Sequence, residues 1–293
     1  MLKLGLCNET ILRKMQSFPL HFFECRIDCI QKIQDDALYD YHYSRIILPQ
    51  NIHKTTYANR FLDADQITLT LLQNKKDVRV HDIAVSSAIT SLELYLSIKE
   101  KNIPCTFYIS DKYANFYSNQ HGLIHTILDD DGQAIHYYLF SVLASPQVSW
   151  LYPISRGLFY ILNYLLGGIN KNYLHQKSPC LSYHRKVLAH FQPGVFEAIS
   201  YDIFYTQMIN SFSYVRAMNI LSLVYFNEEQ IKKALDNIIL SLREDGILQV
   251  GKTSVYGKND VSYFRKQNQR LIHLQDLNQG SEIKSLCLDF PFQ

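Results

Sequence analysis

The pattern of hydrophobic and polar positions divides the chain into three blocks. From Met1 to about Leu62 the spacing is typical of helices and irregular segments, with acidic and aromatic residues mixed. Beyond it, short apolar runs alternate with helical patterns, as in βαβ units. Residues 114–195 interrupt this alternation. We therefore predict an α/β chain with an N-terminal helical segment at 1–62 and a core at 63–293 that contains a large insertion at 114–195.

The clearest strand–helix–strand unit begins shortly after this core opens. "VRVHDIAV" has the apolar density of a short buried strand, and "TSLELYLSIKEKN" has the spacing of a helix that ends near Asn102 and Pro104. "PCTFYISDKY" follows as a second strand. Units of this kind nearly always cross over right-handed within a parallel sheet. We expect the two strands to be parallel neighbours.

Regular alternation returns after the insertion. "VFEAISYDIFY" and "FSYVRAMNIL" are typical of strands, and "NEEQIKKALDNIILSLREDG" of a helix that Asn227 caps and Gly246 ends. "ILQVGKT" predicts another strand, and "VSYFRKQNQRLIHLQDL" an antiparallel hairpin. The fold class that follows is a Rossmann-like, mostly parallel sheet with an antiparallel C-terminal hairpin.

The insertion is less regular than the core around it. "ILDDDGQAIHYYLF" predicts a hairpin that turns at Asp131–Gly132. The run from Val148 to Leu166 approaches the roughly 20 apolar residues that a membrane span needs. It is interrupted, however, by Pro153, Arg156 and Asn163. We favour a buried or capping helix over an interfacial membrane helix, and we expect the insertion to cover the sheet's ligand edge.

Composition narrows the function classes. A hydrophobic content of 47% and a charged content of 19% fit a globular chain, and a net charge of +2 gives no footprint for nucleic acid. Six cysteines at uneven spacings do not resemble a secreted disulfide framework, and the N-terminal apolar stretch is too short for a signal sequence. These features favour a cytoplasmic protein with reduced thiols.

Two kinds of catalytic centre find little support. His21, Cys25 and Cys29 lie four apart, so on one helix they would share a face and could ligate zinc. The neighbouring Phe22, Phe23 and Ile27 make an ordinary packed helix the better interpretation, and we predict no metal site. The chain also lacks a glycine-rich phosphate loop and the "G-x-S-x-G" motif of a serine nucleophile.

Acidic residues close successive predicted strands. Asp82 ends the first, Asp111 ends the second, and Asp202 lies in the third. The carboxyl ends of parallel strands form the crevice in which doubly wound folds bind ligands. In their order and spacing these positions resemble class I S-adenosylmethionine-dependent methyltransferases, over roughly Thr55 to Asp111 and Phe196 to Phe290.

The resemblance implies roles for individual residues. Asp82 corresponds to the family's first acidic residue, and Asp111, followed by Lys112, to the one that bonds the ribose hydroxyls. Asp202 corresponds to the acidic residue beside the adenine, with Ile203 packing nearby. The remaining expected cofactor contacts are Ala84, Ser86, Ala88, Arg216 and Asn219, and the candidates on the substrate side are Tyr57, Arg60 and Tyr225. The "SYVRAMNIL" segment is also similar to one in chemotaxis receptor methyltransferases.

The sequence departs from that family in its loop after the first strand. Ala84, Ser86 and Ala88 occupy the places of three glycines. An alanine in the left-handed region costs about 1–2 kcal/mol, so we expect these small residues to pass the cofactor with negative φ. Each residue also has a purely structural interpretation: an Asp after a strand is often a turn former, and Arg216 can pair with a carboxylate across the sheet.

The resemblance implies S-adenosyl-L-methionine as cofactor and a small molecule or a protein as methyl acceptor. Methyl transfer to nitrogen or oxygen can need a base, for which Tyr225, His136 and Tyr57 are candidates. The alternative is a catalytically inert protein of the methyltransferase fold that binds a ligand or a partner. A dinucleotide-dependent oxidoreductase is a weaker third interpretation, because the phosphate-binding glycines are missing.

Overall fold

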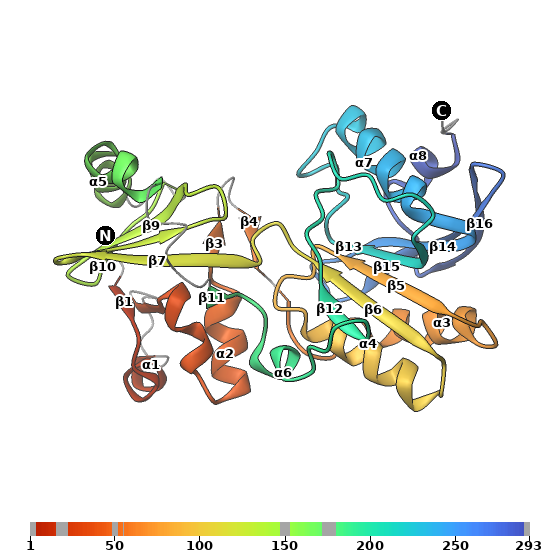
Figure 1. The fold of residues 1–293 in the computed structure, drawn as a ribbon, viewed down its shortest axis with the longest axis horizontal. Coiled ribbons are helices and arrows are strands. Elements are labelled where there is room, and N and C mark those ends of the chain that lie inside the picture. Colours follow the sequence, from red (N-terminus) through yellow and green to blue (C-terminus); the bar gives the residue numbers. More distant parts are fainter. Residues whose placement is uncertain are drawn as a thin grey trace. The chain divides into compact units, whose positions relative to one another are not determined.

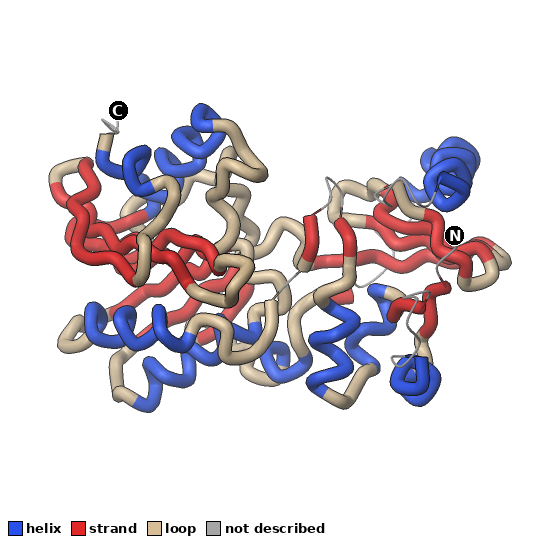
Figure 2. Tube along the Cα trace, turned by 180° about the vertical axis from the view of Figure 1, so that it is seen from behind, coloured by secondary structure: helices blue, strands red, loops and turns tan. Residues whose placement is uncertain are grey.

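The computed structural model describes residues 4–15, 23–48, 52–54, 56–146, 153–171 and 180–289. The chain forms two compact units, drawn as a ribbon in Figure 1 and as a tube in Figure 2. Unit 1 comprises Met1–Tyr57 and Tyr113–Arg185, and unit 2 comprises Ala58–Lys112 and Lys186–Gln293. Each unit is therefore built from two separate stretches of sequence.

Unit 2 is a seven-stranded sheet with helices on both faces. Its strand order is β12-β6-β5-β13-β14-β15-β16. The elements are α3 (Leu62–Leu72), β5 (Val78–Ile83), α4 (Ile89–Glu100), β6 (Cys105–Ser110), β12 (Phe196–Ala198), β13 (Phe212–Met218), α7 (Glu228–Ser241), β14 (Leu242–Thr253), β15 (Asn259–Gln267), β16 (Arg270–Leu277) and α8 (Lys284–Leu288).

The strand directions confirm the predicted fold class. β12, β6, β5, β13 and β14 are parallel to their neighbours, and β15 and β16 close the sheet as an antiparallel hairpin. If the five parallel strands are numbered 1 to 5 along the chain, their order across the sheet is 3-2-1-4-5. This is the order of a doubly wound sheet, in which the chain reverses its direction of winding between the first and fourth strands.

Two apolar clusters hold helices against the two faces of this sheet. On one face α7 packs residues such as Leu235 and Ile238 against Val215 and Leu248 of the strands. On the other face Ala64 of α3 packs against strand residues that include Met218 and Tyr263. Figure 1 shows α7 and α8 on one side of the sheet, with α3 and α4 on the other. The central strands β5 and β13 are thus buried on both faces, as in parallel sheets generally.

Two predicted boundaries in unit 2 are wrong. Asn227 caps α7 with a full capping box to Gln230, as expected, but the helix ends at Ser241 rather than at Gly246, because Leu242 already has extended backbone and begins β14. The strand predicted over "VFEAISYDIFY" stops at Ala198. Its pairing with β6 ends at Ala198 opposite Ile109, and residues 203–205 form a turn.

Unit 1 joins the N-terminal segment to the insertion. Its main sheet has the order β11-β7-β8-β9-β10-β1-β2. The elements of this part of the chain are β1 (Leu4–Leu6), α1 (Glu9–Met15), β2 (Phe23–Cys25), the 3-10 helix η1 (Ile27–Lys32), α2 (Asp36–Tyr43), β3 (Ile47–Leu48), β4 (Ile52–His53), β7 (Asn115–His121), β8 (Ile124–Leu128), β9 (Ala134–Leu139), β10 (Val142–Ala144), α5 (Pro153–Lys171) and β11 (Cys180–Leu181). The short helix α6 (Arg185–Leu188) begins at the last residue of unit 1 and continues into unit 2.

The sequence predicts the N-terminal segment as helical and separate from the insertion. The segment does contain helices, but it also contains short strands, and it is not separate from the insertion. β1 pairs antiparallel with β10 of the insertion and parallel with β2, so strands from both segments share one sheet. The hairpin predicted in the insertion is confirmed: β8 and β9 are antiparallel, with Gly132 in the left-handed region at φ 72°.

Part of the predicted apolar run forms α5. Phe159 and Leu162 are buried against Tyr137 and Ala144, while the opposite side of the helix, including Tyr164, is exposed. Residues 148–152 of the run lie outside the described residues. Within the described ranges, the helices are too short or too polar for a transmembrane span. Membrane contact and the cytoplasmic location both stay predictions.

The cysteine prediction is partly wrong. Cys7 and Cys29 form a disulfide, so not all thiols are reduced in this structure. Cys25 lies in β2 and Cys29 in η1, so the two do not share one helix face, and His21 lies outside the described residues. In the described part of the chain, Cys25, Cys105 and Cys287 take no part in this disulfide.

Candidate functional site

The carboxyl edge of the unit 2 sheet is the place where this fold can bind a ligand. β5 and β13 are adjacent parallel strands, and the chain winds away from them in opposite directions, which leaves a crevice at their ends. Three segments meet at this edge: the loop 84–88 after β5, Asp111 after β6, and Asn219 after β13.

The loop 84–88 has the backbone of a glycine loop without the glycines. Ala84, Ser86 and Ala88 have φ values of 58°, 59° and 59°, so the expectation of negative φ was wrong. A non-glycine residue in this region costs on the order of 1–3 kcal/mol, and such strain persists only where the surroundings impose it. Three of them alternate in one loop of five residues, which makes this the most strained segment that the structure describes in the sheet edge.

Hydrogen bonds from three of the loop's amides account for the conformation. Val85 N donates to the Ser110 carbonyl at 3.2 Å, and Ala88 N donates to the Val85 carbonyl at 2.8 Å. Ser86 N donates to Asp111 Oδ2 at 2.7 Å. The amides of Val85 and Ser86 thus bond to the end of β6, and the amide of Ala88 bonds within the loop. Asp111, whose strand-end position was predicted, therefore lies directly against the loop, and the adjacent Lys112 is exposed.

Two hydroxyl groups in this loop are buried without a partner. Ser87 is 0% exposed and Ser86 is 9% exposed, and neither Oγ has a hydrogen-bond partner in the structure. A buried hydroxyl left unsatisfied costs about 1–3 kcal/mol, so such groups normally bind a ligand or an ordered water. The sequence had marked Ser86 but missed Ser87. The loop thus offers polar groups in addition to its backbone shape.

Asp82 and Arg216 do not line the crevice, which corrects two predicted cofactor contacts. They are register partners on β5 and β13, and their side chains form an ion pair, with Arg216 Nη2 at 2.5 Å from Asp82 Oδ2. Ser91 of α4 donates to the same oxygen at 2.6 Å. Both side chains are buried, so the Asp82 carboxylate lies in the interior of unit 2. The interpretation of Arg216 as a partner for a carboxylate across the sheet is confirmed.

Asp65 completes this buried cluster and was missed by the sequence analysis. Its Oδ1 accepts a hydrogen bond from Arg216 Nη1 at 2.8 Å. Burial raises the pKa of Asp65 to about 7, against the opposing attraction of Arg216. One guanidinium thus serves two carboxylates. The signal was present in the sequence: Asp65 falls at helical spacing between the apolar residues Phe61 and Leu69.

Asn219 and Arg60 tie strand ends together. Asn219 has φ 60°, and its Oδ1 accepts a hydrogen bond from Thr253 N at 2.7 Å. Arg60 Nε donates to Thr253 Oγ1 at 3.0 Å. Asn259 in turn donates to the Arg60 carbonyl at 2.8 Å. These contacts hold the end of β13 to the end of β14, so both residues build the edge whether or not they touch a ligand.

Asp202 and Ile203 form a turn. Asp202 Oδ1 accepts a hydrogen bond from Phe204 N at 2.8 Å, and Thr206 N donates to the Asp202 carbonyl at 2.9 Å. Ile203 is buried in the apolar cluster under α7. Asp202 therefore fits the structural interpretation of a turn former, which the sequence analysis had also considered.

The candidate bases divide between the units. Tyr225 is exposed on the loop that follows β13 in unit 2. Tyr57, which is exposed, and His136, which is buried in β9, belong to unit 1.

Comparisons with known proteins give structural likeness only. No family model matches the chain, and no curated protein matches it. An S-adenosylmethionine-dependent methyltransferase of Methanosarcina mazei is similar at 13% identity and a TM-score of 0.30, over 63% of this chain and 55% of that one. The CMeT domain of the citrinin polyketide synthase is similar at 12% identity and a TM-score of 0.34, over 83% of this chain and 51% of that one.

A protein described as a [4+2]-cyclase, SpnF, is similar to the same degree, at 13% identity and a TM-score of 0.29, over 64% of this chain and 45% of its own. The chain thus spans about half the length of these solved chains. Likeness this distant says nothing of an activity. The similarity to chemotaxis receptor methyltransferases stays a prediction.

Proposed function

We propose that unit 2 binds S-adenosylmethionine at the edge formed by loop 84–88 and Asp111, and that the protein is a methyltransferase. One observation carries the proposal. At the switch point of a doubly wound sheet, three alternate non-glycine residues adopt left-handed backbone, and their loop is bonded to the carboxylate that closes the next strand. Strain of this kind is concentrated at functional sites.

The described residues fit this cofactor at Asp111 and along the loop. The Asp111 carboxylate, at the end of β6, would accept hydrogen bonds from the ribose hydroxyls. Ser86 and Ser87 each have a buried hydroxyl without a partner, which the polar end of the cofactor would satisfy. Asp82 is left out of this set, because it is buried and its Oδ2 is already bonded to Arg216 and Ser91.

S-adenosylmethionine supplies a methyl group on a sulfonium, so the chain's own contribution is to hold the two reactants in line and to exclude water. The small side chains of Ala84 and Ala88 would allow a close approach along the loop. Of the three candidate bases, Tyr225 alone belongs to unit 2. We further propose that the methyl acceptor is a small molecule or a protein.

A second function is favoured by a specific observation. Asp82, the first acidic residue of the motif, forms an ion pair with Arg216 instead of facing a ligand. This is expected of a protein that has kept the fold and lost its catalytic activity. In that case the protein would bind a ligand at the same edge and act as a binding or regulatory module.

Binding and turnover can be measured separately. Thermal unfolding with S-adenosylmethionine at 100 times its dissociation constant should stabilise the chain by about 2.7 kcal/mol. Incubation with methyl-labelled cofactor and cell extract should transfer label to an acceptor. Binding without transfer of label would favour the binding module, and absence of binding would refute S-adenosylmethionine as the ligand of this edge and with it the methyltransferase.

A further inference from the structure

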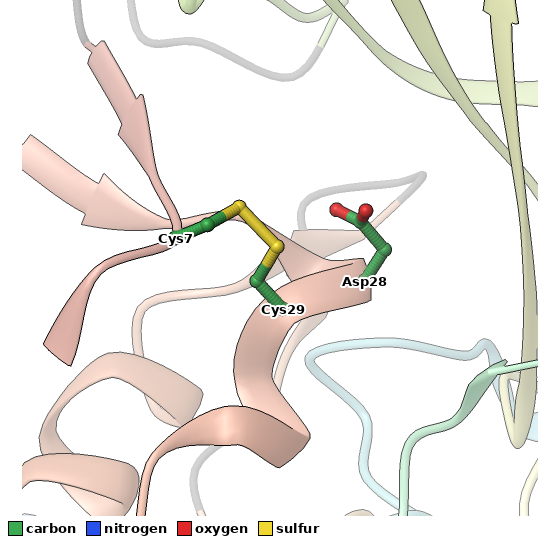
Figure 3. A group of neighbouring side chains, drawn as sticks. All are labelled: Cys7, Asp28 and Cys29. Atoms are coloured by element: carbon green, nitrogen blue, oxygen red, sulfur yellow. A yellow bond between two sulfur atoms is a disulfide. The ribbon is translucent and has the colours of Figure 1, made fainter.

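A second cluster of reactive side chains lies in unit 1, away from any role proposed so far. The Sγ atoms of Cys7 and Cys29 and a carboxylate oxygen of Asp28 all lie within 4.8 Å of one another. Figure 3 shows the Cys7–Cys29 bridge with the Asp28 carboxylate beside it at the start of η1. We propose that reduction of this disulfide creates a binding site for one zinc ion, with both thiolates and the carboxylate as ligands.

The backbone holds the two sulfur atoms together without help from the disulfide. β1 and β2 are parallel neighbours, and Cys7 and η1 follow directly after them. The pairing continues past the strands, because Arg26 N donates to the Leu6 carbonyl at 3.0 Å. Cys29 is also buried in the apolar cluster of unit 1. When the bridge opens, the two thiols therefore stay close to each other.

Asp28 is prepared as a ligand by its neighbours. Arg26 binds it with two hydrogen bonds, Nε to Oδ1 at 3.1 Å and Nη2 to Oδ2 at 2.8 Å. His125 Nε2 of β8 lies 3.1 Å from the same Oδ2. These partners fix the orientation of the carboxylate, as the outer partners of metal ligands generally do.

The ligand chemistry selects zinc among common divalent ions. Thiolates are soft ligands that favour zinc over magnesium or calcium. A divalent ion, two thiolates and the Asp28 carboxylate, with the Arg26 guanidinium beside them, carry no net charge together. Three protein ligands leave the fourth tetrahedral position open to water.

An external dithiol is the reductant that opens the Cys7–Cys29 disulfide. The dithiol passes two hydrogen atoms to the sulfur atoms of Cys7 and Cys29, the bond between them breaks, and the dithiol closes to its own disulfide. Each thiol then releases its proton to solvent as its bond to the metal forms. Cys7 is half-buried rather than fully buried, which leaves a reductant a route to the bridge.

The test uses the full chain in oxidised and reduced form. After reduction and anaerobic removal of the reductant, one equivalent of Zn²⁺ should bind, as measured by competition with a chromophoric chelator. The oxidised chain should bind none. Co²⁺ in place of zinc should give the strong near-ultraviolet absorption of a thiolate–cobalt bond.

Variants identify the ligands. Cys7→Ser and Cys29→Ser should lower the affinity by at least about 100-fold, and His125→Gln, which removes an outer partner, by about 10–100-fold. Cys105→Ser in unit 2 is the matched control and should bind like the parent chain. The unaltered chain gives an independent readout: zinc should protect Cys7 and Cys29 from alkylation, as located by peptide mass spectrometry.

Zinc that binds equally to the oxidised chain, to Cys7→Ser or without protecting these two cysteines would overturn the proposal. So would failure of the reduced parent chain to bind it. Neither result would bear on the cofactor site of unit 2.

Discussion

At the scale of single residues, the loop 84–88 shows which properties of a site a sequence resemblance predicts and which it does not. The order of small residues after the first strand was visible, and so was Asp111 at the end of the second. The sign of φ was not, because alanine and serine normally avoid the left-handed region. The bonds to Ser110 and Asp111, made to the neighbouring strand, help to hold these residues in it.

Replacing Ala84 by glycine should therefore stabilise the protein. Relief of the left-handed strain is offset in part by the greater freedom of glycine in the unfolded chain, which leaves a gain of about 0.5–1 kcal/mol. Ala198→Gly, at an exposed strand position without positive φ, is the control and should lose roughly 0.5–1 kcal/mol. Urea unfolding checks both, and a loss of stability in Ala84→Gly would contradict the strain.

The buried carboxylate of Asp65 predicts a particular dependence of stability on pH. Its pKa is raised to about 7 when folded, so between about pH 4 and 7 the native state holds a proton that the unfolded chain releases. This contribution to stability is complete below about pH 4 and is lost as the pH rises to 7. Asp65→Asn, which keeps the Arg216–Asp82 pair, should abolish that loss.

The measurement is the free energy of unfolding of parent and variant at pH 5 and pH 8. Relative to the parent, Asp65→Asn should gain more than about 1 kcal/mol between the two values. An equal difference at both pH values would mean that Asp65 is ionised throughout.

At the scale of elements, helices with clear ends were predictable and short or long-range pairings were not. The capping box at Asn227 marked the start of α7 correctly, whereas its end at Ser241 is set by the start of β14 and not by a glycine. β12 is shorter than its apolar pattern suggested, because a strand lasts only as long as its neighbour pairs with it.

Removing the cap should weaken the helix locally. Asn227 accepts a hydrogen bond from Gln230 N at 2.9 Å, and Gln230 Oε1 accepts one from Asn227 N at 3.0 Å. Asn227→Ala should cost about 0.5–2 kcal/mol. Amide hydrogen exchange should rise in the first turn of α7, while exchange in β5 stays as in the parent chain. Uniform exchange changes along the chain would argue against a local cap.

At the scale of the whole molecule, the sequence located the core but not the partner of its insertion. The pairing of Leu4 with Val142 joins segments on either side of an entire strand–helix–strand unit, and periodicity carries no information about such a contact. The insertion therefore belongs to a second unit, together with the N-terminal segment that was predicted separately.

Because the two units have separate cores, reduction of the Cys7–Cys29 bridge should lower the stability of unit 1 alone. A bridge that spans 22 residues stabilises by about 3 kcal/mol in the chain-entropy description. In metal-free buffer, reduction should increase hydrogen exchange in β1, β2 and η1 and leave β13 and β14 unchanged. Faster exchange in both units would show that they unfold as one.

The central claim, that Asp111 and its loop hold the cofactor, is tested most directly by isothermal titration with S-adenosylmethionine. Asp111→Asn keeps an acceptor for Ser86 N but removes the charge, so the affinity should fall by about 10–150-fold, as for loss of a charged hydrogen bond. Asp202→Asn, at a carboxylate that serves its own turn, should bind within about twofold of the parent chain. Equal affinity in all three proteins, or equal loss in both variants, would contradict the account.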